Sequence, residues 1–426
     1  MDSHPTQTRF LPRKLTMKKF LLPILCASLT LLAQGEPTLE STMHSYAAPT
    51  PWQTKQRFPE VTKGALAQAI ELARAYLLNH QTPDGNFIYS INLATGKTKG
   101  KDNQVRQAGA LWGIALLNRY RFNEPTRQAL LNGINFFAEN MQDVPTGGRC
   151  ITYPEMPSIR TGTVALFCLS LMELLESQGK YMSETDHAKY QGLLDTHIAY
   201  LQAQELANGS WSEECDIKTG FQVPVGSPYF DGEALLVYCR AARSFGRADL
   251  LPRINDAIPK LIQQYCVDCW KPGGDTDLTK GFYQWACMAF AEYTDANWPE
   301  HRALVRDSAF SLSWWLIFEN DLVHRQGNTG YAIEGLIAAW RIAQTHALPD
   351  EQKILQETAL TVMSRLMPLQ FQGPFMQFNP VLSNLTTAPP LSEGGITNSL
   401  DDLEVRIDTV QHQTHAMLLM HKYLFP

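Results

Sequence analysis

Hydrophobic residues recur at helical spacing along almost the whole chain from Lys63 onward. No run of alternating β-branched and polar residues competes with this pattern, so we expect an all-α protein. The spacing predicts twelve helices, near residues 63–79, 103–121, 125–141, 161–178, 184–205, 229–245, 249–266, 279–294, 299–319, 329–347, 349–366 and 405–423.

The links between these helices alternate in length. Each even-numbered helix is followed by a short link, such as Phe122–Glu124 or Gly246–Ala248, whereas the odd-to-even link between Leu366 and Asp402 spans roughly 35 residues. Such alternation predicts six helical hairpins whose long loops share one face. Four odd-numbered helices also have a proline in or near the first turn, where its missing N–H costs little: Pro125, Pro252, Pro299 and Pro349.

A glycine recurs near the start of five even-numbered helices, followed by small or apolar residues. A glycine inside a helix costs about 1 kcal/mol relative to alanine, so its recurrence predicts that neighbouring helix backbones approach closely. The sixth even-numbered helix has His415 in this place. The five glycines are Gly109, Gly162, Gly232, Gly281 and Gly330.

Six hairpins of this kind resemble the (α/α)6 toroid of the six-hairpin superfamily, over residues 63–423. The turns Gln81-Thr-Pro-Asp-Gly85-Asn-Phe87 and Gln204-Glu-Leu-Ala-Asn-Gly209-Ser-Trp211 are similar to its Gln…Gly-x-aromatic turns, the second with one extra residue. The resemblance implies an inner ring of even-numbered helices and an outer ring of odd-numbered ones. It singles out no family, but the superfamily includes glycosidases, polysaccharide lyases, sugar epimerases and the C-terminal domain of glucuronyl C5-epimerases.

The N-terminal segment has the layout of a secretory signal peptide. Lys18 and Lys19 precede the apolar run 20–25, and Ala33-Gln34-Gly35 ends it in small residues. We therefore expect a signal peptide over 1–35, an extended lead-in over 36–62, a single toroid domain over 63–426, and a periplasmic or secreted protein. The apolar run is too short to span a bilayer, so no membrane span is expected in the mature chain.

Net charge and cysteine content limit which partners and cofactors are expected. Removing residues 1–35 takes away five basic residues and one acidic residue, which moves the formal net charge from −6 to −10. Such a chain does not suit nucleic acid. Cys266-Val-Asp-Cys269 has no second Cys-x-x-Cys to complete a zinc site, so we expect no metal and no cofactor, and either a local disulfide or two inert thiols.

In a toroid of this kind, the N-termini of all six inner helices meet at the face with the long loops. Free N–H groups and helix dipoles there favour an anion. Fixed cations and hydrogen-bonding side chains lie at the same helix ends, so we expect them to bind an anionic oligo- or polysaccharide of the uronate type. These candidates are Arg106, Arg160, Tyr229, Lys280, Asn328, Tyr331, Arg406 and His415.

Four residues are candidates for proton transfer. Asp408 and His412 lie four apart on one helix face, and a carboxylate beside a histidine raises its basicity. Glu334 lies one turn into an apolar helix, so it is either an acid with a raised pKa or the partner of an inner-ring arginine. Asp231 and Glu233 flank Gly232, and one of them is expected to be only a helix N-terminal acid. Asp408 and the histidines could instead be structural.

These residues leave the reaction open among hydrolysis, elimination and epimerisation. Hydrolysis needs two carboxylates across the bond, whereas the other two need a base and cations that hold the substrate's charge. A terpenoid-cyclase-like enzyme is weakly supported, because Asp275-Thr-Asp277 lacks the full acid cluster of such cyclases. A toroid that only binds a glycan or protein is the other alternative.

The signal-peptide hypothesis can be tested directly. N-terminal sequencing of protein recovered from a periplasmic or medium fraction should give a terminus near Glu36, because the small residues of 33–35 suit cleavage. A chain that still begins at Met1 or Met17 would contradict it.

Overall fold

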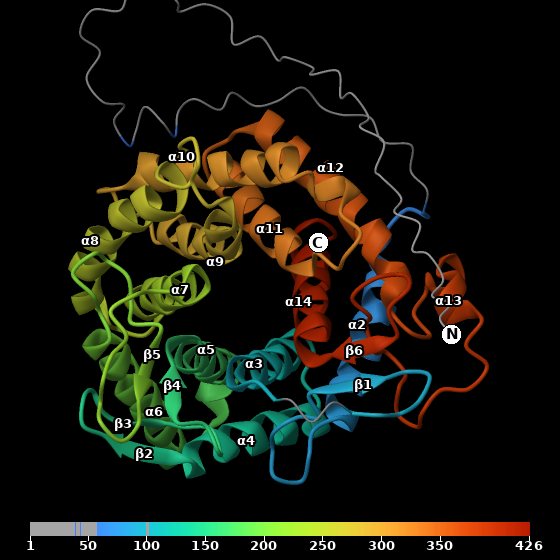
Figure 1. The fold of residues 1–426 in the computed structure, drawn as a ribbon, viewed down its shortest axis with the longest axis horizontal. Helices are drawn as coiled ribbons and strands as arrows, with labels where there is room; N and C mark the ends of the chain where they lie inside the picture. Colours follow the sequence, from blue (N-terminus) through green and yellow to red (C-terminus); the bar gives the residue numbers. More distant parts are fainter. Residues whose placement is uncertain (1–38, 40–42, 44–57, 99–101) are drawn as a thin grey trace, which may run out of the picture. The chain divides into compact units, whose positions relative to one another are not determined.

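The computed structural model describes residues 39, 43, 58–98 and 102–426. The expected signal peptide and most of the lead-in lie outside these residues. Residues Leu39–Pro426 form one compact unit. Within its described part, twelve helices form two concentric rings, an inner and an outer one (Figure 1).

The inner ring consists of the even-numbered helices expected from the sequence. Each packs against its two neighbours, and α14 closes the ring against α3. The all-α toroid is thereby confirmed. The inner helices are α3 (Gln104–Tyr120), α5 (Thr161–Gln178), α7 (Pro228–Ser244), α9 (Thr276–Asp295), α11 (Gly330–Thr345) and α14 (Ile407–Tyr423). The outer helices are α2 (Lys63–Asn79), α4 (Glu124–Glu139), α6 (Glu184–Ala203), α8 (Leu251–Ile262), α10 (Arg302–Trp314) and α12 (Pro349–Leu366).

Helix ends follow local capping chemistry. Side chains of Thr62, Asn103, Asn123 and Ser183 accept backbone N–H bonds at the starts of α2, α3, α4 and α6. Proline occupies the first turn of α4, α7, α8 and α12. Helices α8 and α10 continue as π-helical turns, Gln263–Val267 and Trp315–Glu319. The remaining short helices are Gly179–Tyr181, Ala248–Leu250, Leu322–His324, Met367–Leu369, Met376–Phe378 and α13 (Pro380–Ser383).

Short antiparallel strands, which the sequence pattern did not predict, join the long loops. β1 (Ser90–Asn92) pairs with β6 (Glu404–Arg406), and β4 (Ser158–Arg160) pairs with β5 (Glu214–Asp216). A local hairpin of β2 (Met141–Val144) and β3 (Gly148–Ile151) completes the set within the described residues. Arg160 and Arg406 end β4 and β6 and are also the N-cap residues of α5 and α14. Pairing between loops therefore fixes two arginines at the inner-helix N-termini.

The two glycine turns have the same geometry, and the extra residue expected in the second is not there. Bridges join Gln81 to Phe87 and Glu205 to Trp211, which makes Glu205, not Gln204, the equivalent of Gln81. Gly85 and Gly209 both have positive φ, at 105° and 85°, which favours glycine at this point. The two turns are therefore one structural repeat with identical spacing.

Close helix approach is observed at four of the five recurrent glycines. A Cβ on Gly162, Gly232, Gly281 or Gly330 would lie within 3.0 Å of a neighbouring inner helix or its N-terminal residue. At Gly232 it would lie 2.5 Å from Trp285 Cβ, whereas at Gly109 the nearest atom is Gln411 Oε1 at 3.5 Å. The recurrent glycines also differ in their position along the helix, since Gly330 begins α11 and Gly109 lies within the second turn of α3.

The cysteines do not form the local disulfide. All seven cysteines in the described residues are buried free thiols, and burial raises the pKa of Cys266 well above its ordinary value. Cys266 and Cys269 are therefore the pair of inert thiols that was the other expectation. Among the described helices, none combines the length and apolar character needed to cross a bilayer.

Two glycine-to-alanine variants test the packing of the inner ring. Gly232→Ala should destabilise the protein by roughly 1–3 kcal/mol, because the added methyl group meets Trp285. Gly109→Ala should be neutral or stabilising by up to about 1 kcal/mol, because the added methyl group would make only ordinary van der Waals contacts and alanine favours the helix. Chemical denaturation of both variants measures this difference, and equal effects would contradict the close approach.

Candidate functional site

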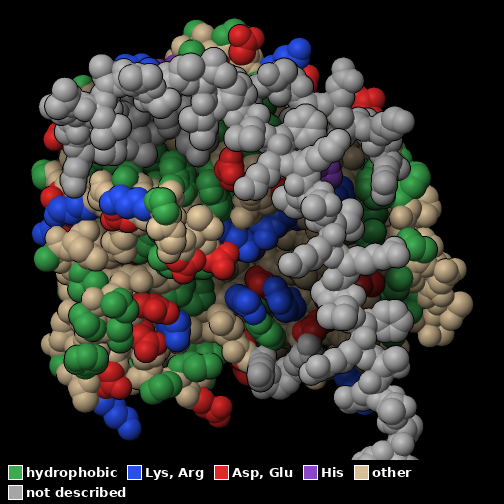
Figure 2. Space-filling model, turned by 45° about the horizontal axis from the view of Figure 1, so that its top comes forward, with side chains coloured by type: hydrophobic (Ala, Val, Ile, Leu, Met, Phe, Trp, Pro, Cys, Tyr) green, Lys and Arg blue, Asp and Glu red, His purple; other side chains and the backbone are tan. Residues whose placement is uncertain are grey.

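Two cavities lie inside the ring. The upper cavity, at the N-terminal ends of the inner helices, has a volume of about 430 Å³, and the lower cavity, at their C-terminal ends, about 460 Å³. Figure 2 shows basic side chains gathered around a hollow in the visible face, with acidic side chains beside them. The upper cavity is lined by nine of the predicted site residues: Arg106, Arg160, Tyr229, Lys280, Asn328, Tyr331, Arg406, Asp408 and His412.

Glu334 of α11 occupies the middle of the ring and has 0% exposed surface. Its Oε1 lies 3.0 Å from Nδ1 of His412, and its Oε2 lies 3.3 Å from Nδ1 of His415. Gln284 of α9 donates a further hydrogen bond to Oε2, at 2.5 Å. Burial alone would raise the pKa of Glu334, but the two histidines lower it below its ordinary value. The partners of this buried carboxylate are therefore histidines and not an arginine.

His412 links Glu334 to the upper cavity. Its side chain is 27% exposed and lines that cavity, while Nδ1 faces the carboxylate. An imidazole that donates Nδ1–H to a carboxylate keeps a lone pair on Nε2. Burial lowers the pKa of His412, but Glu334 outweighs it and the pKa is raised overall. Glu334 therefore fixes the orientation of the His412 ring and raises its pKa, as suits a general base.

Asp408 binds arginines rather than His412. It accepts two hydrogen bonds from Arg406, both 3.0 Å, and an ion pair from Nε of Arg106 at 3.1 Å. Its charge adds only a smaller contribution to the raised pKa of His412. The expected Asp408–His412 pair is therefore replaced by Glu334–His412, whose residues are 78 positions apart.

The other predicted binding residues differ in whether their polar groups already have partners within the protein. Lys280 forms no ion pair within the described residues, whereas Arg160 is balanced by Glu213 and Glu214 at 2.8 and 3.2 Å. The amide of Asn328 donates to Gln413 and so ties α14 to the loop before α11. Tyr331 accepts a bond from Arg325, and Tyr229 is 47% exposed at the mouth. Free positive charge thus comes from Lys280 and from the two arginines around Asp408.

Asp231 lies away from the upper cavity. It is buried, accepts a hydrogen bond from the backbone N–H of Trp211 at 2.8 Å, and accepts another from Tyr265 at 2.5 Å. Burial raises its pKa to about 7. Gln107 makes the equivalent bond to Phe87 in the first glycine turn. This placement argues against the catalytic role considered for Asp231, because the residue holds a turn.

Glu233, two residues after Asp231, lines the upper cavity instead. It is 3% exposed, and its Oε2 has no hydrogen-bond partner within the described residues. Burial raises its pKa well above the ordinary value. Burial of this kind favours the protonated acid over the carboxylate. The sequence indicated only that one of the two acids beside Gly232 is structural.

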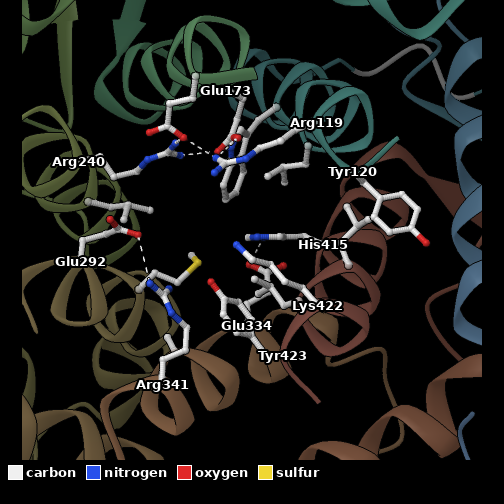
Figure 3. Close-up of a pocket in the computed structure, with 18 of the residues that line it drawn as sticks. Arg119, Tyr120, Glu173, Arg240, Glu292, Glu334, Arg341, His415, Lys422 and Tyr423 are labelled. Carbon is white, nitrogen blue, oxygen red and sulfur yellow. Dashed lines mark hydrogen bonds and ion pairs between the residues drawn. The ribbon is translucent and has the colours of Figure 1, made fainter. Parts of the chain in front are cut away.

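His415 lies on the other side of Glu334 and lines the lower cavity, where it points toward the opening (Figure 3). Its ring contacts Trp112, with centroids 4.6 Å apart, and Trp112 contacts Trp285 at 5.7 Å. Trp285 lines the upper cavity and Trp112 the lower. These rings and Glu334 therefore lie between the two cavities, and His415 does not belong to the predicted binding surface.

Ion pairs between neighbouring helices surround the lower cavity (Figure 3). Glu173 of α5 binds Arg119 of α3 and Arg240 of α7, at 2.8 and 2.5 Å. On the other side, Glu292 of α9 binds Arg243 at 2.6 Å and Arg341 of α11 at 3.8 Å. Burial opposes ionisation of Glu173, but the two arginines lower its pKa to about 2. These charges are paired with one another, so the ion pairs hold neighbouring inner helices together around the lower cavity.

Comparison with known proteins shows the same architecture. No protein-family profile matches the sequence, and no curated protein matches it. The structure is similar to a sugar epimerase from a ruminal bacterium, with a TM-score of 0.57, 9% identity and coverage of 85% of this chain and 99% of the other. A D-mannose isomerase (TM-score 0.54, 12% identity) and an unsaturated glucuronyl hydrolase specific for heparin (0.54, 11%) each cover 85% of this chain and 98% of their own. At this identity the likeness establishes the α/α-toroid fold.

Proposed function

We propose that this protein is a carbohydrate-active enzyme that binds an anionic sugar in the upper cavity and removes a proton from one of its carbons with His412. The observation that carries the proposal is the bond between His412 and the fully buried Glu334, on the wall of a cavity with cations. A general base needs reach, orientation and a suitable pKa, and this pair supplies the last two.

The charges around the cavity suit the intermediate of such a reaction. A C–H bond next to a carboxylate or carbonyl loses its proton when the resulting oxyanion is stabilised. Arg106 and Arg406 both pair with Asp408, and Lys280 has no ion-pair partner in the described region. These groups leave positive charge at the helix N-termini, which favours a uronate-type substrate.

Hydrolysis is less well supported than proton transfer. It needs two available carboxyl groups across the scissile bond. Glu334 is held by two histidines, and Asp408 is held by two arginines, which leaves Glu233 as the single unpaired carboxyl group on the described wall of the cavity. Epimerisation, isomerisation and elimination all use a base such as His412. Two of the structural neighbours, described as a sugar epimerase and a D-mannose isomerase, are in line with this group of reactions, whereas the glucuronyl hydrolase is in line with hydrolysis. The proposal includes an exported, periplasmic or secreted enzyme, on the basis of residues 17–35.

Substitution of the histidine tests the proposal. The assay incubates the enzyme with uronates and aldoses in D2O and follows exchange of carbon-bound protons by NMR. His412→Ala should lower turnover roughly 100- to 10,000-fold, the usual contribution of a general base. His421→Ala is the matched control, because His421 lies on the same helix outside the upper cavity. It should leave turnover unchanged.

Thermal midpoints measured on the same samples separate catalysis from stability. A folded His412→Ala protein with full activity would remove His412 from the mechanism. Wild-type protein that binds anionic sugars without exchanging any proton would instead support a toroid that only binds glycans.

The dependence of turnover on pH tests the partner of the base. His412 must be neutral to accept a proton, and Glu334 raises its pKa above 6.5. Turnover should therefore rise with pH through a midpoint above 6.5. In Glu334→Gln that midpoint should move to lower pH, because an amide stabilises the imidazolium less well. An unchanged midpoint in a folded, active variant would contradict the assigned pair.

A further inference from the structure

We infer that Glu233 is a second proton-transfer residue, which delivers a proton to the face of the sugar carbon opposite His412. The inference rests on the proposed function and narrows it to inversion at a carbon of an anionic sugar. It is carried by the positions of the two residues in the ring and by the unpaired state of the Glu233 carboxyl group.

The two residues lie on opposite walls of one cavity. Around the inner ring, α5 and α3 separate α7 from α14 on one side, and α9 and α11 separate them on the other (Figure 1). Glu233 projects from α7 and His412 from α14, and both line the upper cavity. Trp285 lines the same cavity, with its ring centroid 6.3 Å from that of His412 and its Cβ packed against Gly232. A sugar ring in this cavity therefore presents one face to each residue.

The two carboxyl groups that line the upper cavity differ in their partners. Asp408 is paired with two arginines. Glu233 has neither an ion-pair partner nor a hydrogen bond to Oε2 in the described structure. Burial raises its pKa, and no neighbouring charge in that structure lowers it again. Burial favours the protonated form of Glu233, which suits an acid, whereas His412 directs Nδ1 to the Glu334 carboxylate and keeps Nε2 for a proton, which suits a base.

The step conserves protons and electrons. Nε2 of His412 takes the proton from the carbon, and the C–H electron pair moves into the adjacent carboxylate or carbonyl to form an enolate. The enolate carbon then takes the proton of the Glu233 carboxyl group on its other face, and the electron pair returns to that C–H bond. The step leaves an imidazolium and a carboxylate, which exchange one proton with solvent before the next turnover.

Glu233→Gln separates the two half-steps, because glutamine fills the same space without a transferable proton. In D2O the variant should still exchange the proton of the epimer whose C–H bond faces His412. Conversion of that epimer into its partner should fall by at least about 100-fold. NMR measures exchange and conversion in one sample, so the readout is their ratio. Asp231→Asn is the matched control from the same helix, and it should lower the thermal midpoint while leaving the ratio unchanged.

Conversion by folded Glu233→Gln at the wild-type ratio to exchange would overturn the inference and leave the role of His412 intact. Parallel loss of exchange and conversion would also overturn it, since Glu233 would then serve binding or the first proton transfer. Absence of exchange in the wild-type enzyme is a different result, because it removes the proposed function itself.

Discussion

Glu334 is a carboxylate with no exposed surface inside the helix ring, and the site is arranged around the groups that balance its charge. An uncompensated buried charge costs several kcal/mol, so Glu334 needs partners that satisfy both oxygens. His412, His415 and Gln284 supply them. The two histidines come from one turn of α14, and this forces α14 to present them toward α11. The orientation of His412 in the upper cavity is therefore a consequence of keeping Glu334 charged.

The ring around this carboxylate is held differently at its two ends. At the N-terminal end, glycines such as Gly162 and Gly232 let the inner helices approach, and paired loop strands fix Arg160 and Arg406. At the C-terminal end, arginines of α3, α7 and α11 bind carboxylates of α5 and α9. Arginine near a helix C-terminus is also favoured by the dipole. The N-terminal end thus keeps open, cationic space, while the C-terminal end is internally neutralised.

The sequence predicts most of the fold, because helical periodicity, capping residues and alternating link lengths are local signals. It also predicts the upper cavity, since converging helix N-termini follow from the toroid. It does not predict the bond between Glu334 and His412, because the two residues are far apart in sequence and only ring closure brings α11 beside α14. The spacing of four residues suggests Asp408 as the partner of His412, but in the structure Asp408 forms ion pairs with two arginines.

The same limit explains why the sequence does not separate the roles of the two acids beside Gly232. Asp231 and Glu233 look alike in sequence, and burial alone does not distinguish them. Asp231 meets the backbone of a turn from another hairpin, whereas Glu233 meets cavity and apolar surroundings. Short strands such as β4 and β6 were missed for a related reason, because three-residue segments paired across loops have no periodicity of their own.

The central claim is that Glu334 orients His412 and strengthens it as a base. NMR titration of the side-chain nitrogens of His412 tests it most directly, in the wild-type protein and in Glu334→Gln. The account predicts a neutral form with the proton on Nδ1 and a pKa above 6.5, which decreases when the carboxylate becomes an amide. A neutral form with the proton on Nε2, or a pKa that Glu334→Gln leaves unchanged, would contradict it.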